Sequence, residues 1–268
     1  MARNFNFGAE VATGGGAVFK NPDVGDHESI ITAIVHVGSF QDHFKKGGKV
    51  DIKKPCNYVL VRATLMGDED LNEDGSRMEQ WTAVALKNGD KATLTKLLNA
   101  VDPKEEMDGF DSFIMAPFTV SMVGDEKGGK NEDGTFKYVN WKGFSGCPAK
   151  LAKLVLAQVE EEGITAIGHI TFDQITKDVL DAIPAHMVRQ YFLNETQNGK
   201  NLSVEGSAVA DIIAAAREAD AEWKKRKVQE GDATPERQRP LDTGAQVPSS
   251  VPEAENVATP EMDDEQEY

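Results

Sequence analysis

The sequence has little of what builds metal centres, disulfide frameworks or membrane spans. Its two cysteines, Cys56 and Cys147, lie far apart and show no partner spacing, which argues against a zinc site and a disulfide framework. No run of about 18 or more apolar residues occurs, so no membrane-spanning helix is expected. The first residues lack the apolar stretch of a signal peptide. We therefore expect a cytoplasmic protein that uses no metal or cofactor.

Positive charge is also scarce, since the net charge is −16. Residues 228–268 hold eleven acids and two bases, a net charge of −9, which leaves −7 for the rest of the chain. Whole-protein electrostatics therefore do not favour nucleic acid, and any site for phosphates must be a local basic patch.

Aromatic residues are missing from 228–268 until Tyr268, and this stretch is rich in proline and acids. It cannot bury enough apolar surface to offset the entropy of ordering, so we expect it to be disordered. The remaining chain divides into an N-terminal arm (1–25), a β-rich part (26–146) and a helical segment (147–227). In the helical segment, apolar spacing and possible caps predict helices over 150–159, after Asp173, over 187–192 and over 207–225.

Residues 26–146 alternate between apolar and polar residues in several runs. The alternation predicts strands over 27–37, 56–65 and 80–87, and apolar residues at helical spacing then predict a helix over 90–101. Residues 118–123 and 136–144 are expected to form a hairpin across a long polar loop. This order matches the OB-fold, a five-stranded barrel with a helix between its third and fourth strands. The fold class expected is mainly β with added helices (α+β).

OB-folds bind oligonucleotides on their second and third strands and between two loops, which here are about residues 38–55 and 124–135. The first loop holds five lysines against two aspartates, and phenylalanines lie between the charges. Single-strand binding needs this combination, because cations follow the phosphates and rings stack on bases. Trp141 shares strand parity with Val139 and so tends towards the core. The candidate DNA-binding residues are Phe40, Phe44, Lys45, Lys46, Lys49, Lys53, Lys54, Tyr58, Arg62, Trp81, Lys127, Lys130, Tyr138 and Lys142.

The end of the acidic segment offers a second interaction site. A flexible polyanion can occupy a cationic groove or dock on basic partner proteins, and a terminal ring with its free carboxylate gives such docking an anchor. A plain solubilising tail is the alternative. The candidate partner-binding residues are Asp263, Asp264, Glu265, Glu267 and Tyr268.

The order of elements, the lysine-rich first loop, the acidic tail with its aromatic end and the opening from Phe5 to His27 resemble the single-stranded DNA-binding proteins of tailed bacteriophages. The resemblance covers 1–146 and the tail. It implies sequence-independent binding and protection of single-stranded DNA in phage replication, recombination and repair, in the host cytoplasm. It also implies phage or host polymerase, helicase or recombination proteins as partners, with self-association as a further option.

Two motifs favour other functions only weakly. The stretch from Gly124 to Lys130 fits a phosphate-binding loop but lacks the Ser or Thr after its lysine. Asp70 to Gly75 fits half of an EF-hand loop, but Trp81 stands where the last acidic ligand belongs. We therefore expect no enzyme. A protein-recruitment module remains the main alternative, followed by a metal-dependent nuclease or a nucleotide hydrolase.

Overall fold

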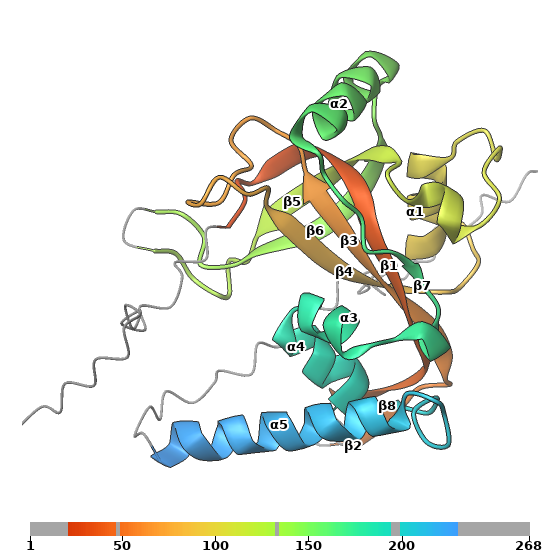
Figure 1. Cartoon of the computed structure of the whole chain (residues 1–268), viewed down its shortest axis with the longest axis vertical. Helices are drawn as coiled ribbons and strands as arrows, with labels where there is room; N and C mark the ends of the chain where they lie inside the picture. Colours follow the sequence, from red (N-terminus) through yellow and green to blue (C-terminus); the bar gives the residue numbers. More distant parts are fainter. Residues whose placement is uncertain (1–20, 47–48, 132–133, 194–198, 230–268) are drawn as a thin grey trace, which may run out of the picture.

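The computed structural model describes residues 21–46, 49–131, 134–193 and 199–229, which form an α+β fold (Figure 1). The strands are β1 (Gly25–Lys46), β2 (Lys49–Ile52), β3 (Cys56–Leu65), β4 (Glu79–Ala85), β5 (Pro117–Gly124), β6 (Val139–Gly146), β7 (Gly168–Ile170) and β8 (Gly199–Asn201). The α-helices are α1 (Thr93–Val101), α2 (Ala149–Glu162), α3 (Lys177–Ala182), α4 (Ala185–Val188) and α5 (Ala210–Gln229). Short 3-10 turns cover Phe110–Phe113 and Phe172–Gln174, and a π-helical turn covers Arg189–Leu193.

Within the described residues, the strands form one eight-stranded, open and mainly antiparallel sheet. Its main path runs β4-β3-β1-β5-β6, and β2, β7 and β8 each pair with β1. Only the pairing of β7 with β1 is parallel in this part of the chain. β1 is therefore the strand that joins all parts of the fold, including the predicted helical segment 147–227.

The length of β1 differs from the expectation. The sequence predicts a strand over 27–37 followed by a loop, but β1 continues to Lys46 and pairs antiparallel with β2. The pairs run from His43 with Ile52 to Lys46 with Lys49. The lysine-rich segment thus contains a two-stranded ribbon, and we call its two strands together with Lys53 and Lys54 the β1–β2 ribbon.

Strands β1 and β3 bury apolar residues on both faces. Ile31, Val59 and Leu65 belong to a first core with α1 and β5. On the other face, Val35 and Leu60 belong to a second core with residues between Ile167 and Ala216. The second and third strands of the predicted OB-fold, β3 and β4, therefore lack the open ligand face that was expected, because the segment after α2 folds back over them (Figure 1).

The predicted helices are found with adjusted limits. Residues 150–159 lie in α2 and most of 207–225 lies in α5, whereas 187–192 is divided between α4 and the π-helical turn. The predicted cap Asp173 lies in a 3-10 turn, and Thr176 caps α3 by accepting a hydrogen bond from the Val179 N–H. Trp141 is in the first core, as its strand parity predicts. Both cysteines are free.

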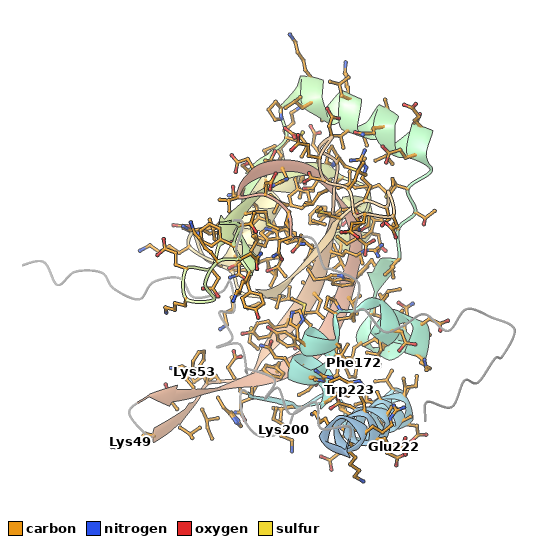
Figure 2. All side chains as sticks on the ribbon, turned by 90° about the vertical axis from the view of Figure 1, so that its left-hand side faces the viewer. Lys49, Lys53, Phe172, Lys200, Glu222 and Trp223 are labelled. Carbon is orange, nitrogen blue, oxygen red and sulfur yellow. The ribbon has the colours of Figure 1, made fainter. Side chains whose placement is uncertain are left out.

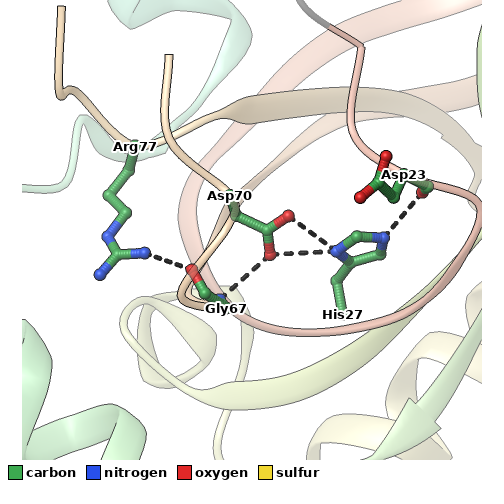
Figure 3. A network of polar contacts seen from close by, with 5 residues as sticks. All are labelled: Asp23, His27, Gly67, Asp70 and Arg77. Carbon is green, nitrogen blue, oxygen red and sulfur yellow. Dashed lines mark hydrogen bonds and ion pairs between the residues drawn. The ribbon is translucent and has the colours of Figure 1, made fainter. Parts of the chain in front are cut away.

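A polar network ties the start of β1 to the loop between β3 and β4 (Figure 3). The Asp70 carboxylate lies 2.8 Å from His27 Nδ1 and also accepts the Gly67 N–H at 3.0 Å. Arg77 donates to the Gly67 carbonyl at 2.6 Å. The loop that resembled half of an EF-hand is therefore a turn, and its first carboxylate, that of Asp70, bonds to His27 of β1.

Over the described residues, no helix combines the length and the apolar character that a membrane crossing requires.

Candidate nucleic-acid interface

The β1–β2 ribbon presents aromatic and cationic side chains together. Phe44 is 38% exposed, and Val50 and Ile52 of β2 are also exposed. Lys49, Lys53 and Lys54 are exposed as well. Lys45 and Lys46 belong to strand β1 and pair through their backbones with Val50 and Lys49. The structure does not describe their side chains.

Contacts within the ribbon hold the Phe44 ring. The ammonium of Lys53 lies 5.6 Å from the centre of this ring, a cation–π contact. Lys53 also forms an ion pair with Asp51, and its backbone N–H donates to the Asp42 carbonyl at 2.9 Å. A phosphate can compete for Lys53 because the pair with Asp51 is exposed and therefore weak.

Phe40 and Tyr58 lie in the second core. Phe40 is fully buried, and its ring centre lies 6.0 Å from that of Tyr58 and 5.1 Å from that of Tyr191. The Tyr58 hydroxyl donates to Asp42 at 2.5 Å, and burial together with this bond raises the pKa of Tyr58. The prediction that these two rings face a base is corrected, because Tyr191, Phe192 and other apolar residues of the second core pack with them.

Arg62 and Trp81 are likewise engaged within the protein. Arg62 is 7% exposed; its Nε donates to Thr32 Oγ1 at 2.8 Å and its Nη1 pairs with Glu79 at 2.9 Å. Its guanidinium lies 5.9 Å from the Trp81 ring, which is partly buried against the second core. Burial lowers the pKa of Arg62. Arg62 was predicted to face the ligand, but it instead ties β1, β3 and β4 together.

The second predicted loop is the hairpin between β5 and β6. Lys127, Lys130 and Lys142 are exposed, and Tyr138 is half-buried. The Lys130 ammonium lies 4.7 Å from the centre of the Phe136 ring. Gly124 leaves room for the Phe136 ring, since a Cβ at position 124 would lie 2.3 Å from it. Gly128 likewise leaves room for the Tyr138 ring, which a Cβ at position 128 would approach to 2.5 Å. The glycines of this motif are therefore explained by the aromatic rings that pack against them. In addition, strand β6 follows the motif, whereas a phosphate-binding loop is followed by a helix.

The structure does not bring the two predicted loops together. β5 pairs with the first residues of β1, from Gly25 to Ile30, so the β5–β6 hairpin lies at one end of β1. The β1–β2 ribbon lies at the other end. Strands β3 and β4, the second and third strands of the predicted OB-fold, were expected to carry part of the ligand face, but the second core covers that face.

One cation near the ribbon was missed by the sequence analysis. Lys200 of β8 is exposed and pairs with Gln41, close to the base of the ribbon (Figure 2). β8 is only three residues long, so no periodicity in the sequence could have revealed it.

Within the described part of the chain, no group of three or more His, Cys, Asp or Glu side chains could hold a metal ion. The predicted partner-binding residues, from Asp263 to Tyr268, lie outside the described residues. No protein-family model, curated protein or solved structure matches the chain.

Proposed function

We propose that this protein binds single-stranded DNA without sequence preference and that the β1–β2 ribbon is the main contact. The observation that carries this proposal is the exposed Phe44 ring, which lies under the Lys53 ammonium on a ribbon that also exposes Lys49 and Lys54. A ring of this kind can stack on any base, and the cations can neutralise neighbouring phosphates. The proposed site comprises Phe44, Lys45, Lys46, Lys49, Lys53, Lys54 and Lys200.

We further propose that β1, β3, β4, β5 and β6 constitute an OB-like barrel. The path β4-β3-β1-β5-β6, with α1 between β4 and β5, has the strand order of that fold. The outer strands β4 and β6 also approach each other. The usual OB ligand face on β3 and β4 is covered, so this proposal moves the DNA site to the projecting ribbon.

The biological role remains the one that the resemblance implies: protection of single-stranded DNA in phage replication, recombination and repair. Under this proposal, the segment from Asp263 to Tyr268 recruits partner proteins or competes with DNA for the ribbon. Lys127, Lys130 and Lys142, which are exposed, and the half-buried Tyr138 lie at the opposite end of β1 and are secondary candidates for DNA contact.

The ribbon proposal is tested by titrating labelled oligo-dT at several salt concentrations against wild type and a Lys49→Glu/Lys53→Glu/Lys54→Glu variant. Wild type should bind saturably, with an affinity that falls as salt rises. The variant should lose most of this affinity, and its plot of log K against log salt should be shallower by about two, since each single-strand phosphate contact contributes roughly 0.7.

A matched control carries the same charge change on exposed lysines elsewhere, Lys104→Glu/Lys150→Glu/Lys153→Glu. It should bind nearly as wild type does. Equal loss in both variants would mean that net charge, not the ribbon, governs binding. Absence of wild-type binding would favour the protein-recruitment alternative. Turnover of ATP or DNA with magnesium would favour an enzyme.

A further inference from the structure

Two aromatic side chains are exposed among the described residues: Phe44 on the ribbon and Trp223 on α5, each 38% exposed. Each lies against a cation. Lys53 is 5.6 Å from the Phe44 ring centre, and the Arg189 guanidinium is 4.7 Å from the Trp223 ring. The same local arrangement thus occurs twice, on two elements about 180 residues apart in the chain.

The surroundings of Trp223 hold it in place. Arg189 donates from Nε to Asp220 at 2.6 Å, and Lys224 pairs with the other oxygen of Asp220 at 2.7 Å. Arg189 is thereby fixed against one face of the indole while part of the ring remains exposed. A ring that is already held loses little side-chain entropy when a base stacks on it.

Cations follow Trp223 directly. Lys225 and Arg226 are exposed, and Glu222 is the one acid among the described side chains from 221 to 226. Cations at a helix C-terminus also interact favourably with the helix dipole, which accounts for their charge. The dipole does not account for an exposed indole clamped beside them.

The ribbon and α5 lie on one side of the molecule. β2, β8 and α5 are close together in Figure 1, and in Figure 2 Lys200 lies between the ribbon, with Lys49 and Lys53, and the α5 residues Glu222 and Trp223. β8 pairs with β1 next to the ribbon, and a short connection leads from β8 to α5. Lys200 therefore provides a cation between the ribbon and the end of α5 that carries Trp223.

We infer that the last turns of α5 form a second contact for the same single strand: Trp223 stacks on a base, and Lys225 and Arg226 contact phosphates. The strand then runs from the β1–β2 ribbon past Lys200 to α5. This inference rests on the proposed function, and it gives a binding role to the helical segment, for which the sequence suggested none.

Intrinsic fluorescence provides a direct test, because the protein has three tryptophans. Trp141 is buried in the first core and Trp81 is partly buried against the second, so Trp223 is the one best placed to stack. Oligo-dT should quench wild-type fluorescence, and Trp223→Phe should remove most of this quenching while binding, followed by a label on the DNA, stays within about threefold. Unchanged quenching in Trp223→Phe would overturn the inference.

Affinity provides the second readout. Trp223→Ala should weaken binding of a long oligo-dT on the order of tenfold, the effect expected for one lost stacking contact. Lys225→Glu/Arg226→Glu should also weaken it and make the salt dependence shallower. Lys150→Glu/Lys153→Glu on α2 is the matched control, with the same charge change on another exposed helix, and should bind as wild type does.

The outcomes separate the two proposals. If wild type binds, the ribbon variant fails to bind and the α5 variants bind like wild type, the inference is wrong and the proposed function stands. If wild type does not bind oligo-dT, the proposed function fails first and the inference fails with it. Urea unfolding of each variant checks the fold: weaker binding with a wild-type unfolding midpoint supports the inference, whereas weakening that occurs only with a lowered midpoint counts against it.

Discussion

The His27 imidazole and the Asp70 carboxylate form a buried pair that fastens the start of β1 to the β3–β4 loop (Figure 3). Nδ1 of His27 faces Asp70 at 2.8 Å, and Nε2 faces the Asp23 carbonyl at 2.8 Å. Both ring nitrogens thus face acceptors, an arrangement that only the doubly protonated imidazolium satisfies with two donors. The hydrogen bond to Asp70 is the main cause that raises the pKa of His27 above 6.5, although burial opposes it.

This pair predicts a loss of stability at alkaline pH. Because the folded pKa is raised, the stabilisation is fully present below about pH 6.5 and is lost as pH rises through the folded pKa. Urea unfolding of wild type should therefore show a decline above pH 6.5 that His27→Gln lacks. His43→Gln, on the ribbon, is the control and should keep the decline; a wild-type profile in His27→Gln would contradict the prediction.

A second histidine, His36, should lower the stability at acidic pH, whereas His27 lowers it at higher pH. His36 Nε2 lies 2.9 Å from His169 Nε2, and His169 Nδ1 lies 3.1 Å from Asp111. The Phe110 ring packs against both imidazoles. Burial, with a smaller contribution from the charge of His169, lowers the pKa of His36 below 6.5.

Since the unfolded chain then binds the proton more readily, stability should fall as pH drops below about 6.5. The loss should loosen the contact between β7 and β1, which this pair bridges. Unfolding midpoints at pH 5.5 and 7.5 measure the effect, and His36→Gln should reduce the difference between them. If the difference is the same in both proteins, other groups cause it.

The two phenylalanines of the ribbon region should behave differently. Phe40→Ala removes a fully buried ring and should lower the free energy of unfolding by about 3–5 kcal/mol. Phe44→Ala should change it by less than about 1 kcal/mol but weaken oligo-dT binding on the order of tenfold. Urea unfolding and DNA titration of both variants check this; strong destabilisation by Phe44→Ala would show that its ring is structural.

Gly199 of β8 lies directly against the Phe40 ring. A Cβ at this position would lie 2.4 Å from Phe40 Cε1 and 2.6 Å from the Gln41 carbonyl oxygen. Gly199→Ala should therefore destabilise the fold by about 1–3 kcal/mol, because the ring must move. Gly25→Ala is the matched control, since its φ of 148° is close to the 155° of Gly199 but its Cβ would meet nothing within 4 Å. Equal unfolding midpoints would exclude the steric explanation.

Local patterns predicted the elements whose own residues specify them. The strands of the main path, α1, α2, α5 and the burial of Trp141 follow from apolar periodicity. The same patterns did not predict β7 or β8, because each is three residues long and forms only against β1. The α+β class followed from the order of elements, whereas the covered face of β3 and β4 did not.

The candidate site shows the same limit. Phe40 and Phe44 look equivalent in the sequence, yet one is buried and the other is exposed, because Tyr191 and Gly199 meet only Phe40. These partners are more than 150 residues away in the chain, so no local pattern distinguishes the two rings. The lysines of the ribbon were predicted as a group because charge density is a local property, and their contact with DNA stays a prediction.

The central position of β1 has a consequence for how the protein is made. The Ser39 N–H bonds to the Ser203 hydroxyl, a contact across 164 residues. At roughly 5–20 residues per second, the ribosome delivers β8 and the residues after it on the order of ten seconds after β1 itself. During this interval, the apolar face of β1 and β3 that later belongs to the second core is exposed, because the residues that pack on it have not yet been synthesised. The nascent protein is therefore most prone to aggregation in this period, and its folding is completed only when β8 and α5 arrive.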